Sequence, residues 1–172
     1  MKAKDTEQLV YPKALKCFRS LKEAIEAFEN ILKKDSQQSQ TDFYRAKRFL
    51  REGEDFFRES IKNARRLLGP LPEYVTPDYK NWRESLLNEY NMLAKTEEEQ
   101  ELVEELLEDD FLNELMSEEE IKKFMTLNYA SQQEGKRKLS HIKIRIIFDK
   151  LDELLAEAKE LQKRILSEKQ IL

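Results

Sequence analysis

The chain has 172 residues, of which 40% are hydrophobic and 38% are charged, with only three Gly and four Pro. This balance favours long amphipathic helices over β-sheet, in one domain large enough for a hydrophobic core. The single Cys excludes an intramolecular disulfide, and no stretch approaches the ~18 apolar residues needed to span a bilayer, so we expect a cytoplasmic protein without a membrane segment.

The net charge of −4 conceals a strong segregation of charge along the chain. Residues 96–120 contain thirteen Asp or Glu and no Lys or Arg, which leaves 31 basic against 22 acidic residues, a charge of +9, in the rest. A local patch, rather than the total charge, decides whether a polyanion is attracted. The sequence therefore predicts a cationic helical body that carries one anionic segment.

The first predicted helix starts near Tyr11-Pro12, where Pro is tolerated in a first turn, and ends at the polar break around Asp35. Apolar residues spaced by three and four mark its buried face: Leu15, Phe18, Leu21, Ile25, Phe28 and Ile31 or Leu32. Cys17 lies beside this face and needs no special role.

The second predicted helix has Thr41 as its N-cap and ends at Gly69-Pro70. Gly53 falls in the middle of its apolar arc, where the missing side chain costs about 1 kcal/mol of helix propensity relative to Ala. We expect either the close approach of another helix or a kink at this position.

Beside that apolar arc lies a stripe of seven cations: Lys47, Arg48, Arg51, Arg58, Lys62, Arg65 and Arg66. The planar fork of Arg binds a phosphate through two donors, and a helix of this length follows several phosphates of a single-stranded DNA or RNA backbone. Tyr44 falls in the same arc and is placed to stack on a base. The alternative is a solvated face whose charges pair within the helix, for example Arg58 with Asp55.

Four further elements follow in the sequence. A connector near residues 69–76 leads to a helix that starts at Thr76-Pro77, and Thr96 then opens a capping box for an acidic helix. A second capping box, Ser117 to Glu120, starts another helix. The last helix is predicted from Ser131 to Ser167, with one apolar stripe: Ile144, Ile147, Leu151, Leu154, Ala158, Leu161 and Ile165. With no internal repeat, the fold class is an all-α bundle of five or six helices in a single domain, residues 1–172.

A second cationic cluster opens the last helix and includes Lys136, Arg137, Lys138 and Arg145. It either joins the first stripe on nucleic acid or docks against the acidic helix, within one chain or between copies. In the acidic helix, we expect a solvated face or a partner-binding patch formed by Glu104, Glu105, Glu108 and Asp109.

Catalytic chemistry has no motif in this sequence. The only His, His141, has Lys138 three residues before it, whereas a di-iron bundle requires Glu-x-x-His. There is no EF-hand loop, no phosphate-binding loop and no Ser-His-Asp or Cys-His arrangement. We therefore expect no metal, no cofactor and no enzymatic activity.

The cationic helix that begins Thr41-Asp-Phe-Tyr-Arg-Ala-Lys-Arg, together with the cluster from Lys136 to Arg145, resembles the small, or belly, subunit of multisubunit CRISPR effector complexes. The resemblance is architectural and spans the whole chain. It implies a non-catalytic helical bundle that stacks head to tail along guide RNA and target DNA beside companion subunits. Some such subunits equal the C-terminal helical domain of a large subunit and are made from an internal start.

Two functions follow as hypotheses. The first is a subunit of a ribonucleoprotein that binds a nucleic-acid backbone through Lys and Arg and associates with itself and with other subunits. The second is a protein-only adaptor or inhibitor, whose acidic helix grips a basic partner or mimics nucleic acid. The sequence does not distinguish DNA from RNA.

Overall fold

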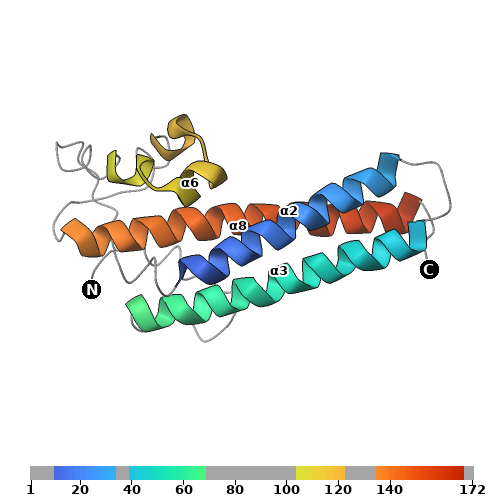
Figure 1. The fold of residues 1–172 in the computed structure, drawn as a ribbon, viewed down its shortest axis with the longest axis horizontal. Helices are drawn as coiled ribbons and strands as arrows, with labels where there is room; N and C mark the ends of the chain where they lie inside the picture. Colours follow the sequence, from blue (N-terminus) through green and yellow to red (C-terminus); the bar gives the residue numbers. More distant parts are fainter. Residues whose placement is uncertain (1–9, 34–38, 69–103, 123–134, 169–172) are drawn as a thin grey trace. The chain divides into compact units, whose positions relative to one another are not determined.

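The computed structural model describes residues 10–33, 39–68, 104–122 and 135–168. These form helices α2 (Tyr11–Lys33), α3 (Ser39–Leu68), α6 (Asp110–Leu115) and α8 (Gly135–Glu168), with two short helical stretches at 104–107 and 118–122 (Figure 1). No residue of these ranges is in a strand. The predicted all-α helical bundle is confirmed.

Most predicted helix ends that fall within these ranges are close to the observed ones. Helix α2 begins at Tyr11, and α3 ends at Leu68, directly before Gly69. The N-cap predicted at Thr41 is wrong, because α3 begins two residues earlier at Ser39 and Thr41 lies in its first turn. The predicted connector at 69–76, the helix from Thr76 and the capping box at Thr96 lie outside the described residues.

The chain divides into two compact units, each built from separate stretches of sequence. Unit 1 combines Met1–Pro12 with Ser60–Lys150, and unit 2 combines Lys13–Glu59 with Leu151–Leu172. Helices α3 and α8 therefore contribute to both units, whereas α2 belongs almost entirely to unit 2. The expectation of one domain over residues 1–172 stays a prediction.

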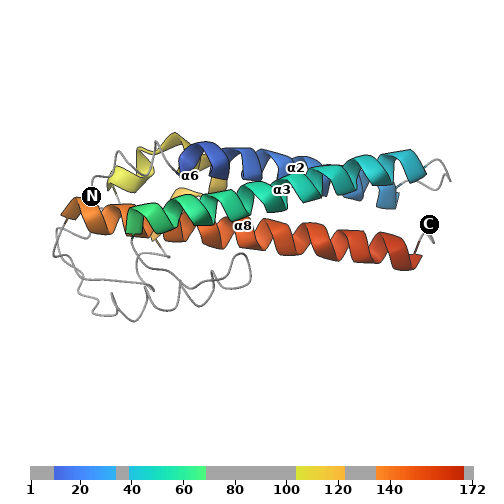
Figure 2. The same cartoon turned by 90° about the horizontal axis from the view of Figure 1, so that it is seen from below.

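The described residues of unit 2 belong to α2, α3 and α8. Helix α2 and the C-terminal part of α8 run in one direction and α3 in the other (Figures 1 and 2). The buried residues of α2 alternate in steps of three and four: Ala14, Cys17, Leu21, Ala24, Phe28 and Ile31. This is the heptad spacing by which left-handed bundles interlock their side chains. The predicted core residues Leu15 and Phe18 are only half-buried, because the seam passes through the smaller Ala14 and Cys17.

The same spacing of buried residues continues along the other two long helices. On α3 it comprises Phe43, Ala46, Leu50, Gly53, Phe57, Ser60 and Ala64. On α8 it comprises the seven residues of the predicted stripe, from Ile144 to Ile165, all of which are buried. The apolar stripe predicted for the last helix is therefore confirmed.

Gly53 marks a close contact between helices α2 and α3. A Cβ atom built at Gly53 would lie 2.6 Å from Cδ2 and 2.8 Å from Cγ of Leu21, closer than carbon atoms pack. Because the seam has no room for a side chain here, the close helix approach predicted for Gly53 is confirmed.

Unit 1 holds the acidic segment, which is broken rather than continuous. The helical stretch 104–107 ends at Leu107, Glu108 lies in a turn, and Asp109 adopts an extended conformation as the N-cap of α6. The predicted acidic helix does not run through this point, because the Asp109 carboxylate accepts a hydrogen bond from the Leu112 backbone N–H at 3.1 Å and starts a new helix.

The second capping box is confirmed by its two reciprocal hydrogen bonds. The Ser117 backbone N–H donates to Glu120 Oε1, and the Glu120 backbone N–H donates to Ser117 Oγ, each at 3.2 Å. These bonds satisfy two amide groups that the first turn would otherwise leave without partners.

Candidate nucleic-acid interface

The outward face of α3 carries most of the predicted cationic stripe. Five of the seven side chains are exposed to solvent: Arg48, Arg51, Arg58, Lys62 and Arg66. Lys47 and Arg65 are half-buried at the edge of this face. The helix positions these cations outward because the opposite side of α3 forms the heptad seam. We call the five exposed residues the α3 cationic face.

Within this face, one cation is paired along the helix. Arg58 Nη1 donates to Asp55 Oδ1 at 2.9 Å, as the sequence spacing indicates. Both side chains are about half exposed, so water screens the pair and it contributes less than about 1 kcal/mol. In the described part of the chain, the other four members form no ion pair with a carboxylate. The face keeps a net positive charge.

An aromatic ring adjoins the α3 cationic face. Tyr44 is 53% exposed, and the Lys47 Nζ lies 5.6 Å from the centre of its ring and at the same distance from that of Phe43. A ring held beside a cation and open to solvent is the arrangement on which unpaired bases stack.

The second cationic cluster is placed differently from the sequence expectation. Every residue from 142 to 148 is buried, including Lys143 at 5% and Arg145 at 3% exposure. Arg145 therefore cannot reach an external phosphate in this structure, because packing surrounds that part of α8 on all sides. The side chains of Lys136, Arg137 and Lys138 lie outside the described residues, although their backbone belongs to α8.

Lys143 instead meets the acidic segment inside unit 1. Its Nζ lies 3.4 Å from Asp109 Oδ2, and both side chains are less than 8% exposed. The Tyr11 hydroxyl donates to the same oxygen at 2.7 Å, and its ring packs edge-on against Phe111 with centroids 5.4 Å apart. At this contact, the cationic cluster docks against the acidic segment within one chain, which is one of the two arrangements expected from the sequence.

The four predicted partner-binding carboxylates separate into two groups. Glu104, Glu105 and Glu108 are exposed on the surface of unit 1. Asp109 is directed inward, where it caps α6 and neutralises Lys143. Of the four carboxylates, Glu104, Glu105 and Glu108 are thus accessible to a partner, whereas Asp109 is not.

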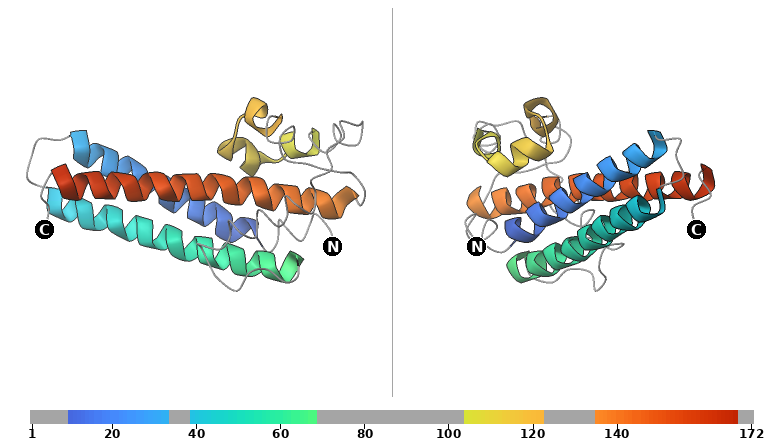
Figure 3. Two further views of the ribbon diagram at one scale, coloured as in Figure 1. Left: turned by 180° about the vertical axis from the view of Figure 1, so that it is seen from behind. Right: turned by 45° about the vertical axis from the view of Figure 1, so that its right-hand side comes forward.

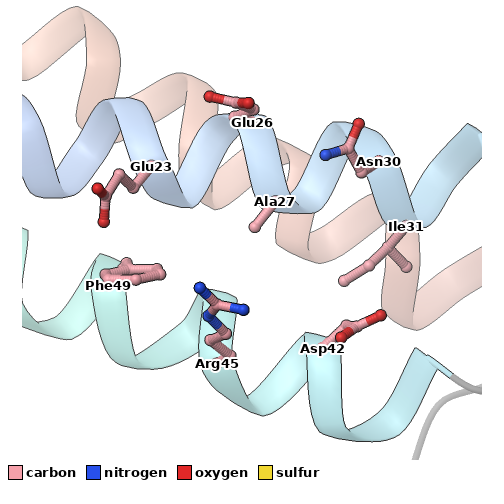
Figure 4. Close-up of a pocket in the computed structure, with 8 residues that line it drawn as sticks. All are labelled: Glu23, Glu26, Ala27, Asn30, Ile31, Asp42, Arg45 and Phe49. Carbon is pink, nitrogen blue, oxygen red and sulfur yellow. The ribbon is translucent and has the colours of Figure 1, made fainter.

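A hollow between α2 and α3 was not predicted from the sequence. It has a volume of about 360 Å³, and Figure 4 shows Arg45 extending across it from α3 toward α2. Its lining combines three carboxylates, one guanidinium and one amide with apolar side chains: Glu23, Glu26, Ala27, Asn30, Ile31, Asp42, Arg45 and Phe49. The three- and four-residue spacing of Glu23, Glu26 and Asn30 beside the seam is the signal that could have indicated it.

Groups suited to catalysis are scarce in the described residues. Cys17 is buried, and its burial raises the pKa of the thiol, which disfavours the nucleophilic thiolate. Among these residues, no group of three His, Cys, Asp or Glu side chains is arranged to hold a metal ion. In the same ranges, none of the helices combines the length and apolar character of a membrane span.

Comparisons of the chain with protein-family models, curated proteins and solved structures gave no significant match.

Proposed function

We propose that this protein is a non-catalytic helical subunit of a cytoplasmic ribonucleoprotein, which binds the backbone of single-stranded DNA or RNA. The observation that carries the proposal is the α3 cationic face, whose five side chains are exposed and of which only Arg58 is ion-paired in the described part of the chain. The charge of the remaining cations is available to an external polyanion.

The spacing of these cations suits an extended phosphate chain. A helix rises about 1.5 Å per residue, so Arg51 and Arg58 stand roughly 10 Å apart along α3, and Lys62 follows one turn later. Contacts with phosphate position a strand without reading its sequence. Tyr44 adds a stacking surface that tolerates any base, so the expected binding is sequence-independent.

Companion proteins would bind through a separate surface. The exposed carboxylates Glu104, Glu105 and Glu108 offer a negative patch to a basic neighbour, either another copy or a different subunit. A chain with one cationic and one anionic surface can stack head to tail, because such an interface joins two different patches. This arrangement is the one implied by the resemblance to CRISPR small subunits.

Charge reversal on α3 tests the proposal. The triple variant Arg51→Glu, Arg58→Glu and Lys62→Glu should lose binding to labelled single-stranded DNA and RNA while it keeps the helical circular dichroism of the wild type. The matched control reverses three acidic residues, Glu104, Glu105 and Glu108, to Lys and should bind at least as well as the wild type. Equal binding by the α3 variant and the wild type would contradict the proposal.

The alternative of a protein-only adaptor or inhibitor is supported by the exposure of the same three carboxylates. It predicts the opposite outcome, in which the isolated protein binds no nucleic acid and the acidic variant loses its protein partner. A pull-down with the two triple variants separates these functions, because each variant disables only one of the surfaces.

A further inference from the structure

An ion pair shows which residues of α3 and α8 lie level with each other in unit 2. Lys159 Nζ is 3.4 Å from Glu54 Oε2, with the two side chains 52% and 27% exposed. The two helices run in opposite directions here, and Figure 3 shows the C-terminal part of α8 alongside α3. Each step along α8 toward its C-terminus is therefore matched by a step of about 1.5 Å along α3 toward its N-terminus.

This register brings a cation of α8 next to the α3 cationic face. Lys163 lies one turn after Lys159 on the same side of α8, so it is level with Leu50 and Arg51. Lys163 is exposed, as is Arg51. The two positive side chains thus stand on either side of the seam between α3 and α8.

The same end of the seam carries two exposed apolar side chains. Leu166 is seven residues after Lys159, and therefore level with Lys47, which is seven residues before Glu54. Tyr44 lies one turn further along α3. Among the described residues, Tyr44 at 53% and Leu166 at 48% are the large hydrophobic side chains exposed to solvent. Single exposed residues are ordinary, but two that lie within about one turn of each other along neighbouring helices, beside cations, indicate a contact surface.

We infer that the nucleic-acid interface extends from α3 across this seam onto α8, with Lys163 contacting phosphate and Leu166 packing against a sugar or base. The inference rests on the function proposed above and names further residues of that interface. The occupant is a single strand, because Tyr44 and Leu166 can receive only bases that are not stacked within a duplex, while Lys47, Arg51 and Lys163 surround them with positive charge.

Adjacent residues of α8 provide a matched test. Lys163 and Arg164 are both exposed, but Arg164 points about 100° further round the helix, where it bonds Glu168 at 3.2 Å. Lys163→Glu should weaken binding of a labelled single-stranded oligonucleotide about tenfold. The slope of log K against log salt should also become less negative, by about 0.7 for each phosphate that the protein no longer neutralises. Arg164→Glu makes the same change of charge on a side of α8 that points away from the seam. Its affinity for the oligonucleotide should therefore remain within about twofold of that of the wild type.

Leu166→Ala tests the apolar part of the seam. It should weaken binding a fewfold without changing the salt dependence, because no charge is removed. Ultraviolet crosslinking of an oligonucleotide that carries a photoreactive base should label the peptides containing Tyr44 and Leu166.

The outcomes separate the two claims. If the wild type binds and Arg51→Glu weakens binding, but Lys163→Glu behaves like Arg164→Glu, the extension onto α8 is overturned and the proposed function stands. If the wild type does not bind, or Arg51→Glu has no effect, the proposed function itself fails. Equal affinity for a duplex of the same length overturns the choice of a single strand. Binding to vesicles of anionic phospholipid but not to oligonucleotides assigns the seam to a membrane surface and overturns the inference.

Discussion

Gly53 shows how the identity of a single residue can indicate the packing of two helices. A glycine in the apolar arc of a long helix costs helix propensity, so its presence indicates a neighbour that excludes a side chain. The structure identifies this neighbour as Leu21 on α2, because a Cβ atom added at Gly53 would lie 2.6 Å from Leu21 Cδ2. The sequence predicted either a close approach or a kink and did not identify the partner, since nothing local to Gly53 specifies which helix faces it.

Gly53→Ala should destabilise the protein by about 1 kcal/mol, because overpacking of about 1–3 kcal/mol exceeds the propensity gained. The measurement is the free energy of unfolding in urea. In a Leu21→Ala background, the added methyl group enters vacated space, so the same substitution should become neutral or stabilising. An effect of Gly53→Ala that is equal in both backgrounds would contradict the contact.

Burial of the Cys17 thiol should make the stability of the protein depend on pH. Its folded pKa is raised by burial above the ordinary thiol value of 9.0, so the neutral thiol stabilises the fold below pH 9.0 and this contribution is lost at higher pH. Between about pH 8 and about pH 10, the wild type should lose about 1.4 kcal/mol more unfolding free energy than Cys17→Ala. Parallel pH profiles of the two proteins would show instead that the thiol is accessible in the folded state.

At the scale of single elements, spacing predicted more than residue size did. The stripe of α8 was predicted in full, with the small Ala158 included, because its members from Ile144 to Ile165 are apolar and alternate by three and four. On α2, the predicted core face included the larger Leu15 and Phe18, whereas the buried seam residues are their neighbours Ala14 and Cys17. Small side chains occupy a seam where helices approach closely, so hydrophobic size alone misplaces the face by one residue.

The break in the acidic segment was not predicted because it depends on tertiary contacts. Asp109 resembles its acidic neighbours in sequence, yet its carboxylate caps α6, accepts from Tyr11 and faces Lys143. Local propensity cannot distinguish one carboxylate of such a run from the next. The pairing of this carboxylate with a distant lysine became visible only in the fold.

Asp109→Asn keeps one oxygen, which can still cap α6, but puts an amide NH2 group in place of Oδ2. Tyr11 then loses this acceptor, and the buried Lys143 loses the negative charge beside it. We expect it to cost about 3–5 kcal/mol of unfolding free energy, because removing one charge of a buried ion pair is strongly destabilising. Asp109→Ala also removes the cap and should cost about 1 kcal/mol more. Thermal or urea unfolding measures both.

The double variant Asp109→Asn and Lys143→Met is the control for this pair. It removes both charges together, so it should recover most of the loss caused by Asp109→Asn alone. Additive losses in the double variant would mean that the two side chains do not stabilise each other.

At the scale of the whole molecule, the separation of basic from acidic residues along the chain indicated which surfaces could bind a charged partner. The α3 cationic face lies where the sequence predicted it, because a heptad seam on one side of a long helix directs the other side to solvent. The cluster at the start of α8 was less predictable. Its charge density resembles that of a surface, but Lys143 and Arg145 are buried among the apolar residues of positions 142–148. A charge pattern alone does not reveal which cations the fold encloses.

The salt dependence of single-strand binding measures how many phosphates α3 contacts. Five exposed cations on α3, at about 0.7 per phosphate contact, predict that log K plotted against log salt falls with a slope of about −3.5 between about 50 and 200 mM. The variant with Arg51, Arg58 and Lys62 changed to Glu should show a slope near zero and little residual affinity. A wild-type slope near zero, or a slope unchanged in that variant, would contradict the assignment of α3 as the phosphate-binding helix.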